Sequence, residues 1–361
     1  MRTGLGAFQA WDRTLLAAAV GLSVLSMVVM ASAAATVQPE LAVRHAVWAL
    51  IGIAVGLGVA RANYRTWTEL AGIAYALSVL TLVLVLVIGA TRLGATRWLS
   101  VFGFSIQPSE LAKLTTVWLL ARYLAGQPTP LPPQVLGWSL LLAGVPALLI
   151  FIQPDLGSAT ILLAIWLGMV WVAGISRRTL LGFAGSLLLL APVGWVLLKD
   201  YQRDRLLAFV DPHADPLGAG YTIIQSIIAI GSGRVWGKGW FAGTQNQLSF
   251  LPERHSDFVF SVLGEEWGFI GCLAVVFLFG LLLHRAASLA VRTSAPQGRL
   301  LATGIFAWIG YQAFINMGMV MGLLPVVGVP LPFLSYGGSS MVALWVAIGL
   351  LQSIHRTDLE G

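Results

Sequence analysis

Residues 14–34 read TLLAAAVGLSVLSMVVMASAA, an apolar run without a single charged side chain. A helix needs about 20 apolar residues to cross the hydrocarbon of a bilayer, and this run has that length. It is longer than the apolar core of a secretory signal peptide, and no cleavage site follows it. We therefore expect it to remain in the protein as a membrane-spanning helix.

Nine further apolar runs follow, near residues 44–60, 66–89, 110–125, 134–152, 157–174, 179–198, 259–284, 299–323 and 338–354. The whole chain is 58% hydrophobic and only 10% charged, whereas a soluble domain carries about 25% charged residues. The sequence therefore predicts an all-α integral membrane protein with about ten transmembrane helices. We expect residues 1–361 to form one polytopic membrane domain.

The distribution of basic residues predicts how the chain crosses the membrane. Ten spans place both termini on one side. If that side is the cytoplasm, the inner segments hold more basic residues than the short outer segments, eleven against four, as the positive-inside rule requires. This topology leaves one long outer loop, about residues 199–256, and loops of this length are usually functional. Within it, residues 220–230 are expected to form a short apolar helix at the membrane surface.

Composition and motifs also exclude several functions. The net charge is +6, but the basic residues are spread singly between apolar runs, so we expect no nucleic-acid partner. The single cysteine, Cys272, excludes an internal disulfide. No nucleotide-binding or metal-binding motif is visible, so no cofactor is evident. Energy must then come from an activated substrate or an ion gradient.

Ionisable residues in or beside the spans are informative, because each is costly unless it is paired or faces water. Glu110 and Lys113 open the fourth span at i, i+3 spacing and can pair on one helix face. They are either a structural ion pair or groups that line a cavity. Glu265 and Glu266 lie two turns into the eighth span, so they must face the bundle interior, where buried hydrogen bonds would fix neighbouring helices, or else line a cavity.

Asp257 lies at the outer boundary of the eighth span, directly before Phe258. A carboxylate at this position is either a helix cap or a general base whose pKa is raised by partial desolvation. His255 is a competing base.

The outer side also carries arginines, the preferred partners of phosphate groups. Arg203 and Arg205 follow the seventh span, and Arg92 and Arg97 follow the third. They are either contacts to lipid headgroups or, as a set, a diphosphate site, for which Lys238 is a weaker candidate. Residues 330–340, PLPFLSYGGSS, break the helix near membrane depth. Such backbone is tolerated only inside protein or beside a water-filled cavity, so we expect this segment, with Ser335, to form a cavity wall.

Five motifs in this order resemble the SEDS family (shape, elongation, division and sporulation) of peptidoglycan polymerases. They are QPSELAKL at 107–114, QPDLGSA at 153–159, DPLGAGYTIIQS at 215–226, SDFVFSVLGEEWG at 256–268 and NMGMVMGLLPVVGVPLPFLSYGGSS at 316–340. Residues 243–255 are most similar to the RodA branch, which acts in cell elongation.

The resemblance implies an inverting transfer of glycan from lipid II, an undecaprenyl-diphosphate-linked disaccharide pentapeptide, to another lipid II, with release of undecaprenyl diphosphate. Asp257 would be the catalytic carboxylate. Asp155 would be structural or cavity-lining, and the diphosphate would be held by Arg203, Arg205, Arg97 and Lys238. A divalent cation, Mg²⁺ or Mn²⁺, is compatible with this step.

The resemblance also implies a place and partners. The chain would lie in the bacterial cytoplasmic membrane with both termini inside and the active site facing outward. Its partners would be a class B penicillin-binding protein transpeptidase and membrane proteins of the elongation complex. Two alternatives stay open: a flippase that carries lipid II across the membrane, and a non-catalytic scaffold for the transpeptidase.

Overall fold

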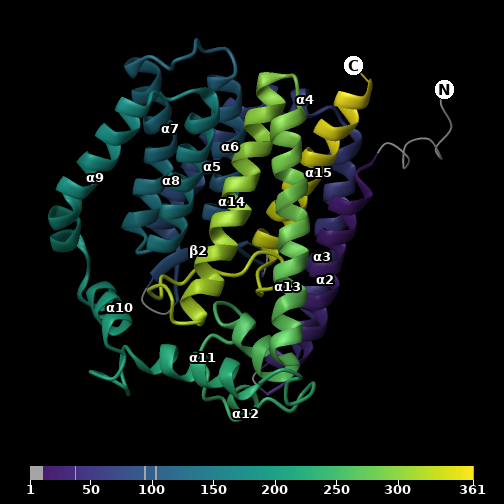
Figure 1. Ribbon diagram of the computed structural model, residues 1–361, viewed down its shortest axis with the longest axis vertical. Helices are drawn as coiled ribbons and strands as arrows, with labels where there is room; N and C mark the ends of the chain where they lie inside the picture. Colours follow the sequence, from purple (N-terminus) through teal and green to yellow (C-terminus); the bar gives the residue numbers. More distant parts are fainter. Residues whose placement is uncertain (1–10, 37, 93–94, 102–103, 361) are drawn as a thin grey trace.

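The structure is a computed structural model that describes residues 11–36, 38–92, 95–101 and 104–360. Each predicted apolar run corresponds to a long helix (Figure 1). The helices are α2 (Arg13–Ala34), α3 (Glu40–Arg61), α5 (Ala71–Ile88), α6 (Pro108–Leu124), α7 (Pro133–Ile152), α8 (Leu156–Ala173), α9 (Arg177–Leu197), α13 (Val259–Arg292), α14 (Pro296–Val320) and α15 (Gly338–Glu360). A short helix, α4 (Tyr64–Glu69), precedes α5.

Seven of the described helices are long and apolar enough to cross a membrane, by length and composition alone: α2, α3, α7, α8, α13, α14 and α15. Helix α5 is apolar but shorter. The prediction of an all-α, multi-pass membrane protein is confirmed.

Small residues let the helices of the bundle approach closely. A Cβ atom added to Gly56 of α3 would lie only 2.5 Å from the carbonyl oxygen of Trp345 in α15. One turn earlier, Gly52 faces Trp345 and the Met341 carbonyl in the same way. Close backbone packing of this kind favours helix association in lipid, where burial of apolar surface gives little advantage. Helix α14 packs between α8 and α13 in the centre of the molecule (Figure 1).

The segment between α5 and α6 is the part of the described chain that forms β-structure. It forms a small antiparallel sheet of three strands: β1 (Ala90–Arg92), β2 (Ala95–Val101) and β3 (Phe104–Ile106). Strands β1 and β3 have three residues each, too few for hydrophobic alternation to reveal them in the sequence. Strand β2 carries Arg97 and places it beside the turn between α7 and α8.

The long loop after α9 is ordered into three short helices: α10 (Asp200–Val210), α11 (Tyr221–Ser232) and α12 (Thr244–Gln247). They cross one end of the bundle, opposite the end where α2 begins and α15 finishes (Figure 1). Helix α11 matches the short apolar helix expected at residues 220–230. It is tied to the bundle by Ser226, whose hydroxyl lies 2.7 Å from that of Ser261 and donates to the Val320 carbonyl at 2.6 Å.

Candidate active site

The turn that carries Asp257 is built from its own backbone. The carbonyl of Glu253 accepts hydrogen bonds from the amides of Ser256 and Asp257, at 3.0 and 3.1 Å. The Ser256 hydroxyl donates to the Glu253 carboxylate at 2.9 Å. The N-cap position of α13 is Phe258, and no side chain caps that helix. The structure therefore does not show Asp257 as a helix cap.

Two other parts of the chain clamp this turn. The side-chain amide of Asn316, fully buried in α14, donates to the carbonyls of both Asp257 and Val329, at 2.8 and 2.6 Å. The Ser335 hydroxyl donates to the Ser256 carbonyl at 2.5 Å, and the Tyr336 amide donates to the His255 carbonyl at 2.8 Å. The expected helix break is present, since no helix covers residues 321–337, and it supports the turn directly.

The carboxylate of Asp257 and the guanidinium of Arg205 face the same small space. A Cβ atom added to Gly328 would lie 3.3 Å from Asp257 Oδ2 and 3.7 Å from Arg205 Nη1. Gly328 has a φ of +69°, a conformation that favours glycine. Gly328 therefore leaves room for an atom between the Asp257 carboxylate and the Arg205 guanidinium, which come from different segments of the chain.

Burial raises the pKa of the half-buried Asp257 carboxyl to about 6. The negative charge of Glu253 raises the pKa further, and so does that of Asp155, while Arg205 and Arg97 lower it. A carboxylate with a pKa near neutrality is well suited to general base catalysis, because it is ionised at working pH and still accepts a proton.

The competing base, His255, lies in the same turn and is half-buried. Burial lowers its pKa, with an opposing contribution from Glu253. The positive charge of Arg254 also lowers this pKa, so the imidazole is favoured in its neutral form.

Arg97 and Arg205 line one small pocket of about 30 Å³. Arg97 donates to the carbonyls of Gln153 and Pro154, and its guanidinium lies 4.0 Å from the Asp155 carboxylate. The guanidinium of Arg205 lies 5.7 Å from the ring centre of Tyr201. The structure therefore brings two of the four predicted cationic residues together beside Asp257.

The other two cations that the sequence predicts, Arg203 and Lys238, make their contacts elsewhere in the structure. Arg203 donates to the carbonyls of Trp195 and Val196, at 3.1 and 2.8 Å, at the end of α9. Arg203 and Arg205 lie two residues apart on α10, so their side chains leave the helix on different faces. Lys238 pairs with Glu265 at 2.7 Å and donates to Thr244 at 2.8 Å. The side chain of Arg92 lies outside the described residues.

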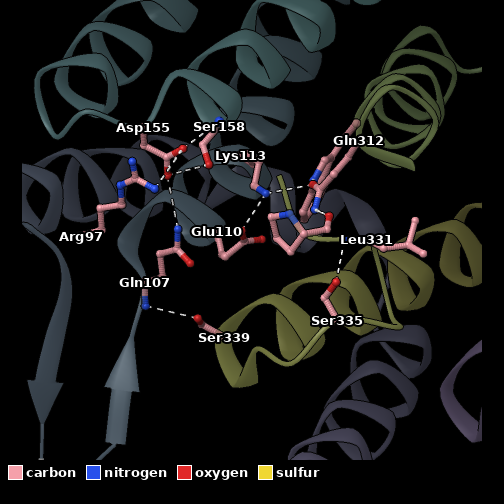
Figure 2. A network of polar contacts seen from close by, with 12 residues as sticks. Arg97, Gln107, Glu110, Lys113, Asp155, Ser158, Gln312, Leu331, Ser335 and Ser339 are labelled. Carbon is pink, nitrogen blue, oxygen red and sulfur yellow. Dashed lines mark hydrogen bonds and ion pairs between the residues drawn. The ribbon is translucent and has the colours of Figure 1, made fainter. Parts of the chain in front are cut away.

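Figure 2 shows the polar network behind the site. The buried ammonium of Lys113 donates to Glu110 at 2.8 Å and to Gln312 at 3.0 Å. The amide of Gln312 donates in turn to the Pro330 carbonyl at 2.9 Å. The pair therefore links α6 and α14 to the segment that supports Asp257, which favours the structural interpretation of Glu110 and Lys113.

Asp155 belongs to the same network (Figure 2). It caps α8 by accepting from the amide and hydroxyl of Ser158, at 3.1 and 2.9 Å. The side chain of Gln107 reaches it at 3.5 Å, and the Gln107 amide donates to Ser339 at 3.2 Å. Asp155 thus holds the starts of α6, α8 and α15 near one another.

Glu265 and Glu266 attach the outer loop to the bundle. Glu265 accepts from Lys238 and from the amides of Gln245 and Asn246, at 2.7, 3.0 and 3.2 Å. Glu266 accepts from Ser32 of α2 at 2.5 Å and from the side chain of Asn246 at 3.2 Å. Both carboxylates face the protein interior.

Sequence reasoning missed Asn316, Gln312, Glu253 and Gly328. A signal existed for the first two, since an amide in an apolar span is costly unless it is hydrogen-bonded. Nothing local distinguishes Gly328 from the many other glycines, because its role depends on Asp257 and Arg205.

In the part of the chain that the structure describes, no group of three or more His, Cys, Asp or Glu side chains could hold a metal ion. The side chains around Asp257 therefore do not make a cation site by themselves.

The family described as cell cycle proteins, FTSW_RODA_SPOVE, matches residues 10–359. The peptidoglycan glycosyltransferase MrdB of Escherichia coli K12 is 42% identical over 307 residues, which cover 84% of this chain and 83% of MrdB. The probable peptidoglycan glycosyltransferase FtsW of Thioalkalivibrio sulfidiphilus is 41% identical over 330 residues, 88% of this chain and 80% of that protein.

Solved structures agree with the fold. One chain belongs to a peptidoglycan synthase complex described as coordinating polymerization and crosslinking. It is 34% identical with a TM-score of 0.84, over 97% of this chain and 99% of that one. The rod shape determining protein RodA of Thermus thermophilus is 32% identical with a TM-score of 0.71, over 96% of this chain and 97% of that one.

Proposed function

Because this chain belongs to the FTSW_RODA_SPOVE family, we propose that it is a peptidoglycan glycosyltransferase that polymerises lipid II during cell elongation. The observation that carries the proposal is that the Asp257 carboxylate and the Arg205 guanidinium both border the space above Gly328, directly before the start of an apolar helix. A base and a cation that share one space suit a reaction in which a hydroxyl attacks and a diphosphate leaves.

The reaction is one displacement. The 4-hydroxyl of the acceptor sugar attacks the anomeric carbon of the donor sugar, and its proton passes to the Asp257 carboxylate. A carbon–oxygen bond forms on one face while the bond to the diphosphate breaks on the other. Undecaprenyl diphosphate leaves with the electron pair, and the α-linked donor becomes a β-1,4-linked glycan.

Arg205 and Arg97 are the residues that would hold the diphosphate, since arginine matches phosphate geometry with several donors. Their positive charge stabilises the negative charge that grows on the leaving group. Asn316 and Ser335 keep the base in position through the backbone on either side of it. The steps use these side chains alone, and a divalent cation would take most of its ligands from the diphosphate.

The membrane orientation and the partner are further parts of the proposal. The positive-inside distribution of arginines supports cytoplasmic termini and an outward-facing Asp257. Likeness to a chain of a peptidoglycan synthase complex supports a class B penicillin-binding protein as the cross-linking partner. Neither the flippase nor the scaffold alternative is favoured by any contact described above.

Polymerisation of purified lipid II tests the function. The chain, purified with its transpeptidase partner, is incubated with labelled lipid II, with moenomycin present to silence other polymerases. We expect a glycan ladder from the native chain and none from Asp257→Ala. Loss of glycan from both, with lipid II crossing liposome bilayers, would establish the flippase instead. A ladder from Asp257→Ala would remove Asp257 from its role.

A further inference from the structure

A segment of the outer loop pairs with a break in helix α13. The helix is interrupted at Gly268, whose φ of +64° and ψ of −159° are not helical. The freed amides of Phe269 and Ile270 donate to the carbonyls of Arg234 and Val235, at 2.8 and 3.3 Å. In return, the amides of Lys238 and Gly239 donate to the carbonyls of Glu265 and Glu266, both at 3.0 Å. Residues 234–239 therefore satisfy the backbone groups that the break leaves open.

The break lies where the helix becomes apolar. The part of α13 after the break, residues 269–292, has 24 residues and is about 36 Å long, enough to cross the hydrocarbon layer of about 30 Å. The first turns of α13, up to Gly268, span about 14 Å and contain Glu265 and Glu266. From Trp267 to Leu283 no charged side chain occurs. The loop that pairs with the break is therefore at the level where this helix enters the bilayer.

Exposed aromatic side chains gather on this loop. Trp236 is 80% exposed, Trp240 52% and Phe241 43%. The indole of Trp240 donates to the Val28 carbonyl of α2 at 3.1 Å, and its ring lies 4.7 Å from that of Phe241. Val28 precedes the end of α2 by about 9 Å along the helix axis. Tryptophan rings at this depth are typical of the boundary between hydrocarbon and headgroups.

The same loop carries an uncompensated positive charge beside a trough. Residues 232–238 line a surface depression of about 540 Å³. Glu265 balances the charge of Lys238. The exposed Arg234 has no ion pair with the described part of the chain. A phosphate group at the boundary complements it.

We propose that residues 232–241, here called the aromatic loop, bind a bilayer phospholipid. The headgroup phosphate lies in the trough against Arg234, and Trp236, Trp240 and Phe241 lie among the headgroups and the first carbons of the tails. Since Lys238 of this loop donates to Glu265, which also accepts from the Asn246 amide of α12, this contact holds the outer loop at a fixed height on the membrane. The proposal is independent of the glycosyltransferase reaction.

The position of the aromatic loop can be measured with one fluorescent probe. Cys272 is the only cysteine, so Cys272→Ser provides a background for labelling Trp236→Cys with the dye NBD. Ala214→Cys, in the exposed turn after α10, is the matched control. Both are reconstituted in vesicles of phosphatidylethanolamine and phosphatidylglycerol. We expect a headgroup-attached nitroxide to quench the probe at 236 strongly and aqueous iodide to reach it poorly, with the opposite pattern at 214.

Substitution of Arg234 tests whether its positive charge holds the loop at the headgroups. Arg234→Gln should raise the iodide-accessible fraction at position 236 about fivefold, the ratio that corresponds to about 1 kcal/mol per basic residue at an anionic surface. Accessibility at position 214 should stay the same. Equal iodide quenching at 236 and 214 would overturn the proposal. Shielding at 236 that appears only after the transpeptidase is added would also overturn it, and would show a protein interface. Glycan synthesis by the labelled chains checks that they are folded.

Discussion

Asp257 illustrates how one residue is tuned by the chain around it. Burial raises its pKa to about 6, and the charge of Glu253 acts in the same direction. Because the folded pKa lies above the ordinary value of 3.8, ionising Asp257 costs stability, which falls as the pH rises from 3.8 to about 6 and then levels. In the proposed reaction Asp257 accepts a proton only when it is ionised, so we expect activity to rise over the same pH window.

The pH dependence of glycan synthesis follows from this shift. We expect the rate at lipid II concentrations well below KM to rise with the ionised fraction of Asp257, with a midpoint near pH 6. Glu253→Gln removes a negative charge that favours the protonated form, so its midpoint should move to lower pH. Initial rates of both proteins across the acidic range measure this. A midpoint that is the same in both would mean that Glu253 does not tune the base.

Arg205 and Arg203 form a natural pair for testing the diphosphate site. Arg205 shares the space above Gly328 with Asp257, whereas Arg203 donates to carbonyls at the end of α9. Arg205→Ala should lower turnover by about 10²–10³, as the loss of one preorganised donor to a developing charge does in other enzymes. Arg203→Ala should leave turnover near the native value. Similar losses in both variants would argue that α10 acts as a whole rather than through Arg205.

At the scale of elements, the pairing of residues 234–239 with α13 depends on Gly237. A Cβ atom at Gly237 would lie 2.1 Å from the carbonyl oxygen of Glu266, but one at Gly239 would meet nothing closer than 3.7 Å. Both glycines have positive φ, +80° and +106°. Substitution by alanine therefore strains the backbone at both positions by about 1–3 kcal/mol, and only at Gly237 does it also push two backbones apart.

We expect Gly237→Ala to lower the thermal unfolding midpoint clearly more than Gly239→Ala, since overpacking adds about 1–3 kcal/mol. Thermal unfolding of the detergent-solubilised proteins measures the difference. Glycan synthesis by Gly237→Ala should fall as well, because Glu265 and Glu266 connect this pairing to α12 and α2. Equal unfolding midpoints would show that the loop moves aside at little cost.

At the scale of the whole molecule, local and long-range features differ in how far the sequence reveals them. The ten apolar runs were predicted because the length and hydropathy of a span are properties of one segment. The break at Gly268 was missed, because its open amides are satisfied by residues more than 30 positions earlier. Asp257 could be identified from its place at a helix boundary, whereas Asn316 and Gly328 matter only through contacts that the fold creates.

The sequence likewise does not reveal which of the outer arginines lie close together in the fold. A count of positive residues on the outer side joined Arg203 with Arg205, but a helix turns by about 200° between them. Charge alone groups Lys238 with these arginines, whereas in the structure its ammonium forms an ion pair with Glu265. Charge alone therefore predicts which kinds of side chain gather near Asp257, and the structure places Arg205 and Arg97 near it while Arg203 and Lys238 contact other groups.

The orientation of the bundle across the membrane can be measured by labelling its two ends. Figure 1 places the loop with α10, α11 and α12 at the end opposite the start of α2 and the end of α15. If the termini are cytoplasmic, an exposed residue of that loop must face outward, and the turn between α13 and α14 must face inward. Ala214→Cys and Ser294→Cys, both at exposed positions, are small changes that report on these two ends in the Cys272→Ser background. In intact spheroplasts, a membrane-impermeant maleimide should label position 214 and leave 294 unlabelled until the membrane is permeabilised. The reverse pattern would put Asp257 on the cytoplasmic side, where the acceptor strand of an external cell wall could not reach it.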